Sequence, residues 1–155
     1  MILQNDENLI PTIKKIGCLF LCLTRIAELE SEKSLTTLQI NEGWIYSKST
    51  YYISKDNLIK QPDEIIKYLM RILDNQDKRV HQVGVSKEGR VVYWGWVKPE
   101  WKDYKYMIEK VSTPGPEGQH HRLCNNKKEV IYDSYSFKDY NHTRLDYYTL
   151  YTRIK

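Results

Sequence analysis

The stretch Cys18-Leu-Phe-Leu-Cys-Leu-Thr-Arg-Ile-Ala-Glu-Leu-Glu30 follows Gly17 and is apolar nearly all round at its start. A helix with that pattern is buried at its N-terminal end, whereas Arg25 and the two glutamates bring its later turns back towards solvent. The stretch therefore predicts a central, partly buried helix over residues 18–30, and this helix begins at a cysteine.

Two further stretches of the first half predict helices. Residues 34–45 begin at Ser34, which we expect to be the N-cap. Residues 62–73 begin with proline and two acids, and their apolar side chains share one face, as a helix with a favourable N-terminus requires. Residues 1–15 are expected to form an extended or irregular lead-in that is broken at Pro11.

After about residue 78 the apolar pattern changes from a helical period to the alternation typical of β-strands. Strands are expected at 80–85, 90–96, 106–111, 120–124, 129–133 and 145–154. Helices first and hairpin-connected strands second predict an α+β fold with a C-terminal antiparallel sheet. A chain of 155 residues indicates one domain over 1–155, with a helical part of about 1–77 and a sheet part of about 78–155.

Composition excludes several classes of protein. Three cysteines cannot form a complete disulfide framework, and reduced thiols fit a cytosolic setting. The net charge of +4 is below the strong basic bias of a dedicated nucleic-acid binder. The uncharged apolar run 16–23 is far shorter than the roughly 20 residues of a membrane span, and the N-terminus lacks the pattern of a signal peptide. We therefore expect a cytoplasmic protein without a membrane span.

The chain carries a cysteine, a histidine and an acid in an order that suits acyl transfer. Cys18 begins the central helix, where backbone N–H groups and the helix dipole favour a thiolate and lower the thiol pKa. Gly118-Gln-His-His-Arg-Leu-Cys124 and Val130-Ile-Tyr-Asp133 follow about a hundred residues later. A thiol needs a base, and the base needs an acceptor that orients it. The alternative for Cys18 is a small buried hydrophobic residue.

The two histidines are adjacent on one expected strand and therefore point to opposite faces of it. His121 shares its face with Leu123, the set more suited to face the core, whereas His120 shares its face with Arg122 and Cys124. Strand alternation thus favours His121 as the base. The other histidine would then be a surface residue or a hydrogen-bonding one, and the choice between the two stays open.

Asp133 ends the strand after the histidine strand, and a hairpin would return it to the neighbourhood of the histidines. There its carboxylate would accept the imidazole N–H and fix the tautomer of the base. The alternative is an ordinary Asp-Ser turn, because aspartate is common where strands end.

The Gly17-Cys18 helix start, the later histidines and Val130-Ile-Tyr-Asp133 resemble papain-like cysteine peptidases of the compact bacterial type. The enzymes that process bacteriocin leader peptides are similar in these three regions. The resemblance implies a papain-like fold in which Cys18 is the nucleophile and Asp133 orients the base. An aromatic residue follows the histidine in those enzymes, so the resemblance favours His120 as the base, with His121 in place of the aromatic.

One departure concerns the oxyanion hole. The peptidases have a glutamine several residues before the cysteine, and its amide helps to bind the oxyanion. Here that stretch is Pro11-Thr-Ile-Lys-Lys-Ile16, so Thr12, Lys14 or the more distant Gln4 would have to take its place beside the Cys18 backbone N–H. A papain-like binding protein that has lost hydrolysis is therefore the alternative function.

Most of the chain also resembles an uncharacterised family of small spirochaete plasmid and prophage proteins, on residues 9–27 and the later Tyr-Asp-Ser. A prophage or plasmid origin implies a peptide or peptidoglycan-like substrate, such as a cell-wall cross-link or a phage or host protein. This substrate prediction follows from the resemblance and not from the chemistry of the residues.

Two other patterns suggest binding. Cys18, Cys22 and Cys124 with either histidine provide four zinc-type ligands, although the spacing is poor because Cys22 lies inside an apolar helical run. Trp94, Trp96 and Trp101 with nearby lysines form either a stacking platform for a partner or ordinary hairpin packing. No motif in the sequence implies a cofactor.

Overall fold

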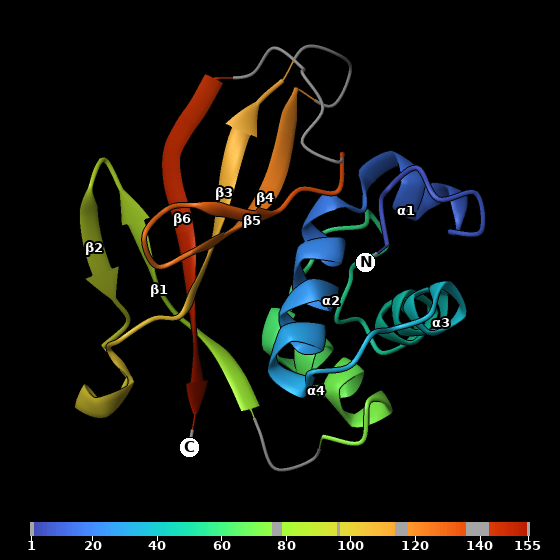
Figure 1. Cartoon of the computed structure of the whole chain (residues 1–155), viewed down its shortest axis with the longest axis horizontal. Coiled ribbons are helices and arrows are strands. Elements are labelled where there is room, and N and C mark those ends of the chain that lie inside the picture. The colour runs from blue at the N-terminus through green and yellow to red at the C-terminus, as the bar shows by residue number, and fades with distance from the viewer. Residues whose placement is uncertain (1, 76–78, 96, 114–117, 136–142, 155) are drawn as a thin grey trace.

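The computed structural model describes residues 2–75, 79–95, 97–113, 118–135 and 143–154. Helices come first in the chain and pack on an antiparallel sheet built from the second half, so the predicted α+β class is confirmed (Figure 1). The helices are α1 Pro11–Ile16, α2 Cys18–Ser31, α3 Thr37–Ser49, α4 Pro62–Ile72 and the short 3₁₀ helix η1 Pro99–Trp101. The strands are β1 Arg79–Lys87, β2 Arg90–Tyr93, β3 Tyr106–Ser112, β4 Gln119–Asn125, β5 Val130–Tyr132 and β6 Thr143–Ile154.

The six strands follow the order β2-β1-β6-β3-β4-β5, and every neighbouring pair is antiparallel. The last strand of the chain, β6, therefore lies in the middle of the sheet between β1 and β3. Helices α2 and α4 contact the sheet, and α3 packs against α4 on the side away from the strands (Figure 1). This arrangement places the N-terminal part of α2 against β4, the strand that carries both histidines.

The two faces of the sheet bury different side chains, as the alternation of strand residues requires. Ile108 on β3 lies opposite Leu123 on β4, and both belong to the main core under the helices. Met107 and Cys124, each one position away, lie opposite one another in a second apolar cluster on the other face. Odd-numbered residues of β4 such as His121 therefore point towards α2.

The lead-in before α2 is helical, so the prediction of an extended or irregular segment over 1–15 is wrong for α1. Pro11 is the first residue of α1 rather than a break, since proline is favoured in the first helical turn, where its missing N–H is not needed. Gly17 then joins α1 directly to α2. A Cβ atom at Gly17 would lie 2.5 Å from the Ile13 carbonyl oxygen and 2.8 Å from its Cα, so only glycine allows this junction immediately before Cys18.

Helix α3 begins later than predicted, and its N-cap is Thr36 instead of Ser34. The Thr36 hydroxyl accepts a hydrogen bond from the Gln39 N–H at 3.1 Å, and the Gln39 side chain accepts one from the Thr36 N–H at 2.9 Å. This reciprocal capping box satisfies two backbone donors, whereas a serine cap alone would satisfy one. Within the described residues, no helix is long and apolar enough to cross a bilayer.

Candidate active site

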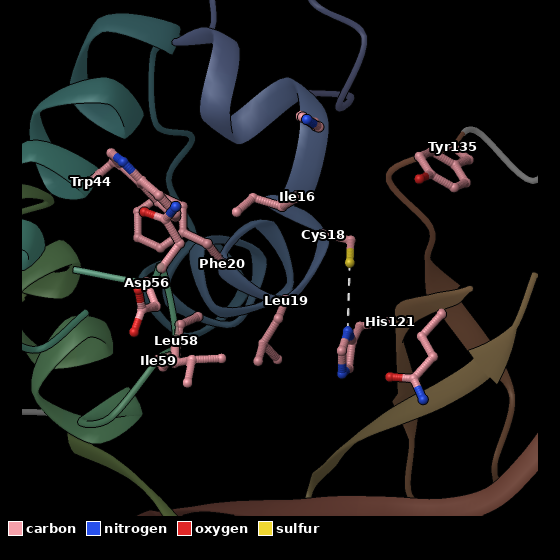
Figure 2. Close-up of a pocket in the computed structure, with 13 residues that line it drawn as sticks. Ile16, Cys18, Leu19, Phe20, Trp44, Asp56, Leu58, Ile59, His121 and Tyr135 are labelled. Carbon is pink, nitrogen blue, oxygen red and sulfur yellow. Dashed lines mark hydrogen bonds between the residues drawn. The ribbon is translucent and has the colours of Figure 1, made fainter. Parts of the chain in front are cut away.

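Cys18 and His121 meet at the junction between the helical layer and the sheet. Cys18 is the first residue of α2 and is 8% exposed, and its Sγ lies 3.5 Å from Nδ1 of His121 on β4 (Figure 2). Of the two histidines, the one that contacts the thiol is therefore the one that strand alternation favours. A cysteine and an imidazole at this separation can exchange a proton, which is the first requirement of a thiol nucleophile.

A second thiol fixes the position of the same histidine. Cys22, one turn further along α2 and fully buried, donates a hydrogen bond from its Sγ to the backbone carbonyl of His121 at 3.7 Å. Cys18 thus contacts the ring of His121 while Cys22 contacts its backbone. The two contacts set the register of α2 on β4, and the clash that any side chain would cause at Gly17 fixes where α2 begins.

Burial keeps both groups of the pair neutral at pH 7. Desolvation raises the pKa of the Cys18 thiol, and the backbone N–H groups of His121, Leu19 and Cys18 itself oppose this only in part. Desolvation also lowers the pKa of His121 to about 4, with smaller contributions from the nearby Lys110 and His120. The prediction that the helix N-terminus lowers the thiol pKa is therefore wrong in net direction, because burial outweighs the backbone dipoles.

The pair lies at one end of a pocket of about 320 Å³. Figure 2 shows Leu19, Leu58 and Ile59 on one side of the pair and Tyr135 on the other. The lining residues come from the α1–α2 junction, α3, the loop between α3 and α4, and the two ends of the histidine hairpin: Lys15, Ile16, Cys18, Leu19, Phe20, Trp44, Asp56, Asn57, Leu58, Ile59, Gln119, His121 and Tyr135. Most of this lining is apolar, which is typical of a site that binds a substrate side chain.

The loop that forms the far wall is held by one lysine. Lys48 near the end of α3 donates from Nζ to the carbonyl oxygens of Ser54 and Lys55 and to the Asn57 side chain, at 2.8, 3.2 and 2.7 Å. An isolated bridge between Ile53 and Ile59 closes the same loop. Sequence reasoning missed this wall, since nothing in the local pattern of residues 50–61 indicates that it folds back towards Cys18.

The second histidine pairs with the acid. His120 Nε2 lies 2.8 Å from Asp133 Oδ1, and the two side chains are 0% and 1% exposed. The imidazole of His120 stacks on the ring of Tyr135, with centroids 3.9 Å apart and planes 6° from parallel. Asp133 Oδ1 also accepts the backbone N–H of Tyr135 at 2.9 Å. The hairpin thus returns Asp133 to the histidines as predicted, but Asp133 pairs with His120, whereas Cys18 contacts His121.

Residues 1–148 match a family model described as "Protein of unknown function, DUF261". The chain belongs to the DUF261 family. No curated protein and no solved structure matches it. The expectation of an uncharacterised family covering most of the chain is confirmed, and the papain-like relationship stays a prediction.

The three oxyanion candidates of this DUF261 chain do not line the pocket. Gln4 is buried and its side chain has other partners: Nε2 donates to the Lys14 carbonyl at 3.1 Å, and Oε1 accepts from the Ser134 hydroxyl at 2.8 Å. The Lys14 side chain is exposed and Thr12 is half-buried on α1. Gln4 therefore ties the N-terminal segment to the residue after Asp133 instead of facing a substrate.

The binding patterns of the sequence are arranged differently from a metal site or an open platform. Among the residues that the structure describes, no group of three or more potential ligands is placed to hold a metal ion, and Cys22 and Cys124 belong to separate apolar clusters. Trp94 and Trp101 are partly buried against the cluster that contains Cys124, and Trp96 lies outside the described residues.

Proposed function

We propose that this protein is a thiol hydrolase of papain-like type that cleaves a peptide or amide bond, with Cys18 as nucleophile and His121 as general base and acid. The observation that carries the proposal is the 3.5 Å contact between Cys18 Sγ and His121 Nδ1 at the end of a pocket of about 320 Å³. A nucleophile at a helix start, a base within reach and an adjoining apolar pocket are the parts that acyl transfer needs.

Because Cys18 and His121 are both neutral before the reaction, the first step must include transfer of the thiol proton. The first step requires the tautomer of His121 with its proton on Nε2, because Nδ1, the nitrogen nearest the Cys18 thiol, must then accept its hydrogen. As the sulfur attacks the carbonyl carbon, the thiol proton moves to Nδ1 and the carbonyl π pair moves to the oxygen. Collapse of this oxyanion expels the amine, which takes the proton from His121 and leaves a thioester on Cys18.

The second step regenerates the thiol. Water attacks the thioester carbonyl while His121 accepts one of its protons, and the carbon–sulfur bond breaks to release the carboxylic acid. The proton on His121 then returns to sulfur. Because the pKa of His121 is lowered to about 4, its imidazole is unprotonated over the whole neutral range and can accept a proton as attack proceeds.

Acylation by p-nitrophenyl acetate tests the proposal, because the reagent needs no substrate recognition. The native protein should release nitrophenolate in a burst and carry an acetyl group on Cys18, detected by peptide mass spectrometry. Cys18→Ala should abolish the burst, and His121→Ala should slow it by about 10²-fold or more, as loss of a general base does. Cys124→Ala is the matched thiol control and should leave the burst unchanged, because Cys124 is buried on the other face of the sheet.

Nitrophenolate release that is equally fast in Cys18→Ala and in the native protein would overturn the proposal. The alternative predicted from the sequence, a catalytically inactive protein that binds a partner, would then be the hypothesis to pursue. Once acylation is established, a library of fluorogenic peptides should identify which substrate residues the protein prefers next to the cleaved bond. Incubation with peptidoglycan fragments tests the prediction that the substrate is a cell-wall cross-link.

A further inference from the structure

The chemistry proposed above leaves one requirement unmet by the residues that the sequence singled out. Attack by Cys18 places a negative charge on the former carbonyl oxygen, and removal of a single hydrogen-bond donor to such an oxyanion costs about 10²–10³ in rate in a well-studied protease. The backbone N–H of Cys18 is available at the start of α2, where helical N–H groups have no acceptor within the helix. Neither Gln4 nor Lys14 lines the pocket to provide a second donor.

Tyr135 does line the pocket, and it lies on the opposite side of the Cys18–His121 pair from Leu58 and Ile59. Figure 2 shows its hydroxyl on the side of the ring that faces Cys18. A phenol hydroxyl is a hydrogen-bond donor that stays protonated at neutral pH. It can therefore donate to a charge that develops on an oxygen held at Cys18.

The orientation of Tyr135 is set at two points. Its backbone N–H donates to Asp133 Oδ1 at 2.9 Å, and its ring stacks at 3.9 Å on His120, which in turn contacts the same Asp133 oxygen at 2.8 Å. Asp133 thus holds both the backbone of Tyr135 and the flat ring against which the phenol lies. Fixing a donor in advance is what makes oxyanion stabilisation effective.

His120 and Asp133 are 0% and 1% exposed, so neither can touch a substrate. An acid–imidazole pair next to a nucleophile ordinarily orients the base, but here Cys18 contacts the other histidine. Both members of the His120–Asp133 pair contact Tyr135: the His120 ring stacks on its ring, and Asp133 accepts its backbone N–H. These contacts hold Tyr135 in place beside the pocket.

We infer that the Tyr135 hydroxyl donates a hydrogen bond to the oxyanion formed when Cys18 attacks a carbonyl, and that His120 and Asp133 are positioning residues for Tyr135. This inference rests on the proposed function and deepens it. It assigns a role to His120 and Asp133, two residues that the sequence predicted to belong to the site.

Two thiol reagents separate this role from the reactivity of Cys18. With p-nitrophenyl acetate the sulfur attacks a carbonyl, the carbon–sulfur bond forms through an oxyanion and nitrophenolate leaves, while His121 passes the thiol proton to solvent. With iodoacetamide the sulfur displaces iodide from a saturated carbon, and no oxyanion arises. Tyr135→Phe should therefore slow acetylation of Cys18 by about 10²-fold and leave its alkylation within about twofold of the native rate.

Tyr147→Phe is the matched control, since Tyr147 is a solvent-exposed residue of β6 and also loses only a hydroxyl. It should leave both reactions unchanged. Equal acetylation rates for Tyr135→Phe and the native protein would overturn the inference while the proposed function stands. A native Cys18 that is not acetylated at all would overturn the proposed function, and the inference with it.

A double-mutant cycle tests the positioning role. His120→Phe keeps an aromatic ring against Tyr135 but loses the contact with Asp133, so acetylation should slow while alkylation by iodoacetamide is retained. Adding Tyr135→Phe should then cause little further loss, because both changes act through the same hydroxyl. Fully additive losses would show that His120 acts independently of Tyr135 and would overturn that part of the inference. Tyr135→Phe alone tests the donor role even if His120→Phe does not fold.

Discussion

At the level of single residues, the site combines a reactive pair with an environment that suppresses its charges. Cys18 and His121 are close enough to share a proton, yet burial raises the thiol pKa and lowers the imidazole pKa to about 4. A thiolate–imidazolium pair is disfavoured because both ions would lose hydration together. The site is thus arranged for transfer of the proton during attack rather than before it.

This electrostatic state predicts a distinctive pH profile for alkylation of Cys18. A thiol whose pKa is above 9.0 reacts through a small thiolate fraction that grows about tenfold per pH unit. The rate with iodoacetamide should therefore be below that of a free thiol at pH 6 and keep rising beyond pH 8. Site-resolved mass spectrometry over pH 5 to 9.5, with the unfolded chain as reference, measures it. A plateau below pH 7 would contradict the prediction and indicate a preformed ion pair.

The elements of the fold differ in how well the sequence predicts them. The long apolar stretch of α2, the proline-led α4 and the alternating strands carry strong periodicity and were predicted correctly in type and place. Strand alternation also indicated which face of β4 meets the helices, and hence the contact of His121 with Cys18. Those features follow from local patterns, because burial on one face is visible in the spacing of apolar residues.

Features that depend on contacts between distant segments were not predictable in the same way. The six-residue α1 is too short to be stable alone and depends on packing of Ile13 and on its junction at Gly17. The side chain of Gln4 accepts a hydrogen bond from Ser134, a residue 130 positions away. The local sequence around Gln4 therefore does not indicate that this side chain is held outside the pocket. The rings of Tyr135 and His120 likewise stack on one another only because the folded hairpin brings them together.

The N-cap of α3 gives a direct test at the level of an element. Thr36→Ala removes the hydroxyl that accepts the Gln39 N–H, and we expect it to lower the free energy of unfolding by about 1 kcal/mol. Ser34→Ala is the control because Ser34 is exposed and outside the capping box, and its effect should stay within about 0.5 kcal/mol. Urea unfolding followed by circular dichroism measures both. A larger loss for Ser34→Ala than for Thr36→Ala would show that the helix begins where the sequence suggested.

At the scale of the whole molecule, one buried carboxylate joins the helical layer to the sheet. Glu30 in the last turn of α2 accepts hydrogen bonds from Lys105 Nζ at 2.7 Å and Tyr106 OH at 2.5 Å. Its other oxygen pairs with Arg153 on β6. Because the same helix begins at Cys18, this cluster fixes the far end of the element that presents the nucleophile to β4.

The pKa of Glu30 indicates how this cluster responds to acid. Burial of the carboxylate raises the pKa, but the hydrogen bonds from Lys105, Tyr106 and Arg153 together outweigh it, so the net shift is downward from 4.5. A carboxyl whose pKa is lower in the folded state contributes stability above its unfolded pKa and loses it as pH falls through the folded value. The contribution of Glu30 is therefore complete at pH 7 and is lost in acid as the pH falls from 4.5 through its lower folded pKa.

Glu30→Gln tests this account because it keeps the size of the side chain and removes its charge. At pH 7 we expect a loss of about 3 kcal/mol in the free energy of unfolding, at the lower end for a broken buried ion pair, since Lys105 and Arg153 can still reach water. Glu42→Gln on the exposed side of α3 is the matched control and should be nearly neutral. The difference between Glu30→Gln and the native protein should shrink as the pH of the urea titration is lowered towards 3. A difference that is the same at both pH values would mean that the link between helix and sheet depends on the shape of this side chain and not on its charge.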